Sequence, residues 1–209
     1  MIMNKKLKIF NFEKPKTLYR YIYPGDLFCY QLANKLYGYG RIVAKNKWGA
    51  LAEFFDFFTE NPVEGFDYEN YENYKVLFKM ILDCYSTFSA DRSVELWKHV
   101  NYRIIAQDKS YTNPNPDEIT SVSEIMGLEH NADFSIERKI SVKDAMEKIK
   151  NNPELDETPR THYDTLDLLV LYKPELFTPE NAPFMCDEHD RFIEKCFKET
   201  YQQELNLKK

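Results

Sequence analysis

The first half of the chain carries its apolar residues in the short, alternating runs that are typical of β-strands. Residues 27–32 are rich in β-forming side chains, and residues 37–45 alternate between two faces. One face of the second run carries Tyr37, Tyr39, Arg41 and Val43. Residues 23–26 read Tyr-Pro-Gly-Asp, with proline and glycine at the two central positions of a type II turn. We therefore expect a turn followed by a β-hairpin over residues 27–45.

A nearly continuous apolar run over residues 50–58 is compatible with either a strand or a helix. Its flanks, Trp48-Gly49 and Asn61-Pro62, limit it to strand length, so we expect a buried strand. In a strand, Glu53 and Asp56 lie on opposite faces, whereas on a helix they could form a carboxylate pair. No catalytic carboxylate pair is therefore expected here.

Further strands are expected over residues 76–82, 96–106 and 134–140, and residues 113–117 have the composition of a loop. Together with the hairpin, these segments predict an α+β protein with a mostly antiparallel, curved β-sheet core. The predicted helices are concentrated in the C-terminal third.

Two helices are expected after the strands. Ser141 and Asp144 have the spacing of a capping box, which predicts a helix ending near Lys150. A last helix should begin near Asp187, with an apolar stripe of Phe192, Ile193, Cys196 and Phe197. We expect residues 1–140 to form a β-rich core and residues 141–209 a helical extension that packs on it.

The composition argues against the common catalytic and cofactor sites. Glycine is scarce, with six residues in 209, and no three of them fit a phosphate-binding loop. The four cysteines have long, irregular spacings, and the four histidines lie far apart. We expect Cys29 to be a small core residue and residues Cys186 to Asp190 to begin a helix. We expect no metal, no cofactor and no catalytic residue.

The hydrophobic pattern of the sequence also predicts neither a signal peptide nor a membrane span. Lys5, Lys6 and Lys8 interrupt the apolar residues near the N-terminus, which does not resemble a signal peptide. The most apolar later segment, residues 166–172, is far shorter than a membrane span. We expect a cytoplasmic protein with no membrane association.

Charge is distributed unevenly along a chain whose formal net charge is −6. Between Lys47 and Lys75 there is no basic residue. That interval contains the acids Glu53, Asp56, Glu60, Glu64, Asp67, Glu69 and Glu72. Such a run is usually a solvated surface, but it would also attract a basic partner and repel nucleic acid. We therefore expect no nucleic acid as partner.

One part of the sequence resembles a known family. The resemblance lies in Gly25-Asp26 followed by Phe28 and an apolar run, in residues 35–43 (Lys-Leu-Tyr-Gly-Tyr-Gly-Arg-Ile-Val), and in a strand bearing Phe55-Asp56. It extends more loosely to Trp97. This pattern resembles the immunity protein 26 family of bacterial polymorphic toxin systems.

The resemblance implies a mostly β fold, no enzymatic activity, and a protein that neutralises a toxin made by the same or neighbouring cells. Toxins of such systems are often nucleases with basic clefts, so the partner would be a toxin domain with a basic surface. Two other functions stay open. One is a small-molecule or nucleic-acid binding module that uses Tyr37, Tyr39 and Arg41, and the other is a hydrolase built on Asp or Glu with His.

The second half of the basic-free interval is the predicted docking site. It contains Pro62, Gly65 and a repeated pattern of acids and aromatics, so it cannot easily bury all its carboxylates. The predicted contact residues are Glu64, Asp67, Tyr68, Glu69, Tyr71 and Glu72. The acids would lie in solvent and raise the association rate, while a tyrosine would anchor the partner.

Overall fold

A six-stranded antiparallel sheet forms the centre of the molecule. The computed structural model describes residues 6–12, 21–33, 35–88, 102–160 and 162–177. In spatial order, the strands are β1 (Leu7–Ile9), β6 (Arg103–Asp108), β2 (Asp26–Ala33), β3 (Leu36–Lys45), β4 (Ala50–Thr59) and β5 (Val76–Leu82). The sheet is open, because β1 and β5 at its two edges do not pair with each other. Bulges interrupt the register of β2, β3 and β4, and bulges bend and twist the strands that contain them.

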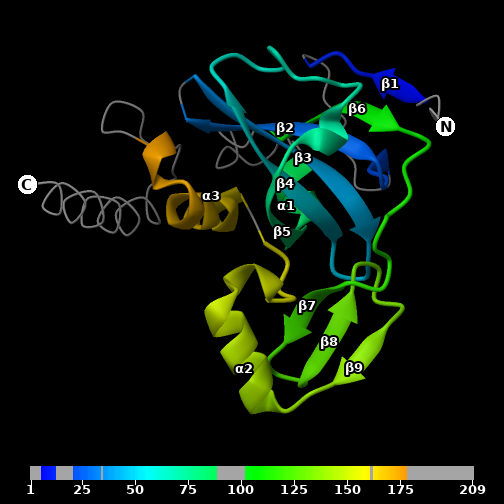
Figure 1. Ribbon diagram of the computed structural model, residues 1–209, viewed down its shortest axis with the longest axis vertical. Coiled ribbons are helices and arrows are strands. Elements are labelled where there is room, and N and C mark those ends of the chain that lie inside the picture. Colours follow the sequence, from blue (N-terminus) through cyan, green and yellow to red (C-terminus); the bar gives the residue numbers. More distant parts are fainter. Residues whose placement is uncertain (1–5, 13–20, 34, 89–101, 161, 178–209) are drawn as a thin grey trace, which may run out of the picture.

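A second, three-stranded antiparallel sheet lies below the first in Figure 1. It consists of β7 (Ile119–Ser123), β8 (Leu128–Asn131) and β9 (Glu137–Lys139), in that order. Its residues Ala132 and Phe134 pack against Val43, Leu51 and Ile81 of the large sheet. This contact joins the two sheets in one structure.

In the described residues, three α-helices accompany the sheets. They are α1 (Cys84–Phe88), α2 (Val142–Asn151) and α3 (His162–Tyr172). In the described part of the chain, both helices of ten or more residues follow Ser141, so the expected α+β class with C-terminal helices is confirmed. The Ser141 hydroxyl accepts a hydrogen bond from the Asp144 amide at 3.0 Å, which is the predicted cap of α2.

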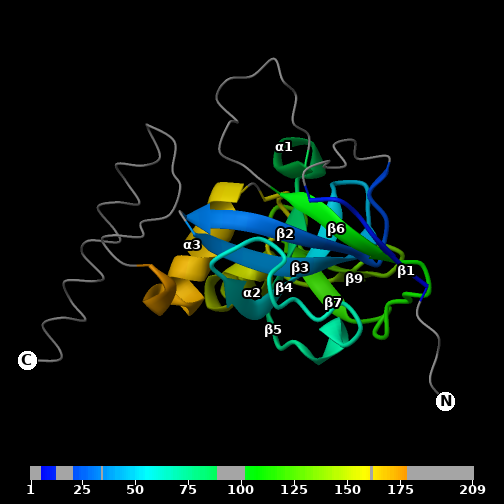
Figure 2. The same ribbon diagram turned by 90° about the horizontal axis from the view of Figure 1, so that it is seen from above.

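The large sheet buries apolar side chains on both faces. One face carries Phe28, Tyr30 and Phe54, and α1 and α3 contribute Phe88 and Leu166 to the same cluster. The other face carries a separate cluster of Leu27, Cys29, Tyr39, Phe55 and Ile105. It is covered by the connection between β4 and β5. Figure 2 shows this connection and α1 on opposite sides of the sheet.

Local sequence explains the hairpin of β2 and β3. Gly25 adopts a φ of +84°, and the Asp26 amide donates to the Tyr23 carbonyl at 3.0 Å, as a type II turn requires. Gly40 has a different role, because a Cβ there would lie 2.3 Å from both the Glu53 carbonyl oxygen and the Phe28 ring. The hairpin and the strand expected over residues 50–58 are both confirmed.

Other expectations were only partly met. The strand expected over residues 134–140 begins at Glu137, because Phe134 has a φ of +65° in the preceding turn. β7, β8 and α3 were not anticipated. The helix expected from Asp187 and the first part of the strand expected over 96–106 lie outside the described residues. The division at residue 140 stays a prediction, and α3 shares the core of the large sheet.

Candidate partner-binding surface

The connection between β4 and β5, residues 60–75, is called the acidic loop below. It lies along one face of the large sheet and is drawn in cyan to green in Figures 1 and 2. Its inner side is aromatic: the Phe66 ring stacks on Tyr39, with centroids 4.8 Å apart, and the Tyr74 ring stacks on Phe57 at 4.5 Å. Burial of these rings holds the loop on the sheet.

Tyrosine hydroxyl groups also hold the backbone of the acidic loop. The Val63 amide donates to the Tyr39 hydroxyl at 2.9 Å, and that hydroxyl lies 2.7 Å from the Thr59 hydroxyl. The Asp67 amide donates to the Tyr74 hydroxyl at 2.9 Å. A loop fixed by side-chain hydrogen bonds and ring stacking loses little further entropy when a partner binds it. The sequence pattern did not single out Tyr39 and Tyr74 for this role.

The four predicted acids, Glu64, Asp67, Glu69 and Glu72, are all exposed, as expected. They differ in what they do within the loop. The Asp67 carboxylate accepts hydrogen bonds from the amides of Glu69 and Asn70, both at 3.0 Å, and so shapes the turn. The Glu64 carboxylate accepts one from the Asn61 side chain at 2.7 Å. Because replacing Asp67 or Glu64 would remove these hydrogen bonds as well as a charge, we choose the exposed Glu69 and Glu72 to test surface charge.

Tyr71 does not lie where the sequence pattern placed it. Its side chain is fully buried, and its hydroxyl donates to Asp108 Oδ2 at 2.9 Å. Burial raises the pKa of Tyr71 well above its usual value, and the hydrogen bond to Asp108 adds to this effect. A side chain with no exposed surface offers no contact area, so the expectation that Tyr71 docks a partner was wrong. Tyr68 is only partly buried and stays a candidate contact.

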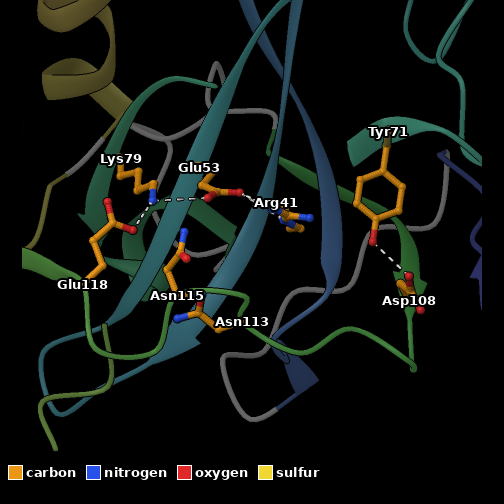
Figure 3. Close-up of polar contacts among 8 residues, drawn as sticks. All are labelled: Arg41, Glu53, Tyr71, Lys79, Asp108, Asn113, Asn115 and Glu118. Carbon is orange, nitrogen blue, oxygen red and sulfur yellow. Dashed lines mark hydrogen bonds and ion pairs between the residues drawn. The ribbon is translucent and has the colours of Figure 1, made fainter. Parts of the chain in front are cut away.

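Figure 3 shows a row of charged residues that begins with the buried Arg41 and Glu53 and ends at the exposed Glu118. Arg41 Nε donates to Glu53 Oε2 at 3.1 Å, and the Lys79 ammonium lies 3.6 Å from the other oxygen of Glu53. Lys79 also contacts Glu118 at 2.7 Å, nearer the surface. Burial alone would lower the pKa of Arg41, but the Glu53 carboxylate raises it. Each charge in this row therefore has an opposite charge beside it.

Tyr39 and Arg41 are covered, which bears on the alternative function as a small-molecule or nucleic-acid binding module. Tyr39 is fully buried and Arg41 is 8% exposed, under the acidic loop and the ring of Tyr111, whose centroid is 4.6 Å from the guanidinium. A binding module that uses Tyr37, Tyr39 and Arg41 would need this face open. The structure therefore contradicts the placement of a small-molecule or nucleic-acid site there.

Within the described part of the chain, the candidate catalytic groups are not assembled into a site. Glu53 contacts Arg41 on one face of β4, whereas Asp56 contacts Lys173, 2.9 Å away, on the other. Burial raises the pKa of the Cys29 thiol to about 12, which disfavours the nucleophilic thiolate. Within the described residues, no three His, Cys, Asp or Glu side chains are grouped to hold a metal ion. The ligand-type residues Cys186 to Asp190 lie outside the described part of the chain.

The described α-helices have five, ten and eleven residues. None of them combines the length and the apolar character that crossing a bilayer requires.

The residues that carry the family resemblance are largely structural. Gly25 forms the turn, Gly40 allows close packing, and Arg41 forms the buried ion pair with Glu53. Comparison with protein families gives a match over residues 23–123 to the family described as Immunity protein 26. No curated protein and no solved structure matches the chain. The matched segment runs from the turn before β2 to the end of β7, so that part of the chain is similar to the family described as Immunity protein 26.

Proposed function

We propose that this chain is an immunity protein that binds a toxin domain of a polymorphic toxin system in the cytoplasm and neutralises it. The toxin domain would have a basic surface, as the nucleic-acid cleft of a nuclease does. The proposal does not require catalysis by the chain. The observation that carries it is a preordered loop with exposed carboxylates, in a segment that is similar to an immunity protein family.

The acidic loop has the features of a docking surface for a basic protein. Its exposed acids would accelerate association by long-range attraction, in a manner that weakens as salt increases. Tyr68 is partly buried against Phe66, with ring centroids 5.0 Å apart, so it is held in place and still accessible. A tyrosine held in this way can act as an anchor at low entropic cost.

The test uses any toxin domain that a gene neighbouring that of this chain encodes. Co-expression should protect cells from that domain, and the two purified proteins should form a complex. Glu69→Lys combined with Glu72→Lys should slow association at least tenfold at low salt and much less at high salt. Tyr68→Ala should mainly speed dissociation, by about tenfold or more.

The matched control reverses two exposed acids outside the acidic loop, Glu124→Lys in the turn after β7 and Glu147→Lys in α2, and makes the same change in net charge. This variant should bind nearly as wild type does. If both double variants slow association equally, overall charge is responsible and the acidic loop is not the docking site. If the wild-type chain neither binds nor protects, the proposed function itself is wrong.

A further inference from the structure

One edge of the three-stranded sheet is open to another chain. β9 pairs with β8 on one side, and no segment of the described residues pairs with its other side. All three residues of β9 are exposed. In Figure 1, β9 lies at the outer side of the small sheet, at the opposite end of the molecule from the acidic loop. An unpaired edge presents backbone donors and acceptors that a further strand can bind.

The register shows which backbone groups face outward. Ile140 donates its amide to the Gly127 carbonyl, and Asn131 donates to the Ile136 carbonyl. Residues 136, 138 and 140 therefore direct their backbone groups toward β8. In an antiparallel strand this role alternates, so the amides and carbonyls of Glu137 and Lys139 point away from β8, toward the open edge.

The sequence of this edge is complementary to itself. Residues 136–140 read Ile-Glu-Arg-Lys-Ile, with apolar ends, opposite charges next to the centre and one arginine at the centre. When two copies lie antiparallel about Arg138, Glu137 of each copy faces Lys139 of the other, and Ile136 faces Ile140. The two outward-facing residues then meet as hydrogen-bonded pairs, which is the geometry that an antiparallel ladder requires.

The central arginine does not prevent this pairing. Two Arg138 side chains would face each other across the twofold axis, and like charges in that position are unfavourable. Within its own protomer, however, Arg138 lies directly opposite Glu129 on β8. The Glu129 carboxylate also contacts Lys148 of α2. The register therefore places an acidic residue opposite each arginine before the two copies meet.

We propose that β9 pairs with β9 of a second copy of this chain, forming a twofold-symmetric dimer with one continuous six-stranded sheet. The contact is isologous, so it closes after two copies and does not propagate. Because the edge is short, the dimer is weak and depends on protein concentration. β9 lies outside residues 23–123, and the dimer leaves the acidic loop of each copy uncovered.

The test is sedimentation of the full chain between about 1 μM and about 1 mM, the range in which weak contacts dissociate. Wild type should shift reversibly from monomer to dimer. Lys139→Glu creates two Glu–Glu pairs and Glu137→Lys creates two Lys–Lys pairs, so each should weaken the dimer about tenfold or more. The double swap of both residues restores opposite charges and should restore the affinity.

Mixing supplies an independent readout. Lys139→Glu and Glu137→Lys chains together form two Glu–Lys pairs, so the mixture should dimerise more strongly than either variant alone. The matched control is Lys143→Glu at the start of α2, an equal charge change that should leave association unaltered.

If wild type is monomeric over the whole concentration range, the proposal is overturned. The charged residues of β9 would then be the feature that prevents edge-to-edge pairing. A dimer that none of the swaps affects would also overturn the proposal. Met146→Glu would then test the exposed apolar residues Ile125, Met126, Val142 and Met146 as the interface.

Discussion

The acidic loop should lose its order when the Tyr39 hydroxyl is removed. The Thr59 hydroxyl donates its only proton to the Asn61 carbonyl at 2.7 Å, so the Tyr39 hydroxyl is the donor in their contact. Tyr39 also accepts from the Val63 amide at 2.9 Å. Tyr39→Phe therefore removes two hydrogen bonds while keeping the ring that packs on Phe66.

The magnitude follows from the environment of Val63. Each lost hydrogen bond costs about 1 kcal/mol, so Tyr39→Phe should lower the free energy of unfolding by about 1–2 kcal/mol. Val63 has a φ of +60°, which is strained for a β-branched residue by roughly 1–2 kcal/mol. Without the bond to Tyr39 the strain favours local opening. Exchange of the Val63 amide should become about tenfold faster, since 1.4 kcal/mol is a factor of ten.

Hydrogen exchange and urea unfolding on the purified chain measure both effects without a partner. Tyr102→Phe is the control, because the Tyr102 hydroxyl donates to Thr165 at 2.9 Å on the opposite face of the sheet. It should reduce global stability and leave the local opening that exposes the Val63 amide unchanged. Equal Val63 exchange in Tyr39→Phe and wild type would refute the role of Tyr39 in ordering the loop.

Three further outcomes are expected. Arg41→Met or Glu53→Gln should each lower the free energy of unfolding by about 3–5 kcal/mol in urea titrations, because each removes the hydrogen-bonded ionic partner of a buried charged group, and the double replacement Arg41→Met with Glu53→Met should cost less than either. Gly40→Ala should lower the thermal midpoint, because the new methyl group would lie 2.3 Å from the Glu53 carbonyl oxygen. Burial raises the pKa values of Cys29 and Cys84 from 9.0 to about 12, so their contribution to stability is complete below pH 9 and is lost as the pH rises from 9 to 12. Unfolding titrations across this range should show a smaller decline when both cysteines are replaced by alanine.

Elements with a strong local signal could be predicted from the sequence. The hairpin follows from the turn at Gly25 and the alternation after it, and α2 follows from the cap at Ser141. β7 and β8 were missed because Ile119–Ser123 and Leu128–Asn131 are short and partly polar. Their strand conformation depends on pairing with each other, which local propensity does not report.

The sequence contains a signal that predicts the burial of Tyr71. Tyr68, Tyr71 and Tyr74 are spaced by three residues, the period of a 3₁₀-helix, and such a helix spans Tyr71–Asn73. With that period all three tyrosines lie on one side, and Glu69 and Glu72 lie on another. The alternation of acids and aromatics therefore indicated a loop with a buried tyrosine side and an acidic outer side.

The pairing of Arg41 with Glu53 could also have been predicted from the sequence, because the two residues lie in the hairpin of β3 and β4. Its turn lies at residues 46–49, so residues at similar distances before and after it face each other, and Arg41 and Glu53 are opposite in the register. The pattern could not show that the acidic loop would cover the pair, because that burial depends on Tyr71 reaching Asp108 from a different segment.

The same contrast explains why the family could be recognised while the partner could not. Recognition rested on residues such as Gly25, Gly40 and Arg41, whose roles are a positive φ, a close approach and a buried ion pair, and few substitutes satisfy such constraints. Glu69 and Glu72 are exposed, and many residues would be compatible with the fold at those positions. A motif of buried residues therefore identifies the scaffold. Under the proposed function, the choice of partner is encoded in exposed side chains, and binding measurements on variants of those residues test it.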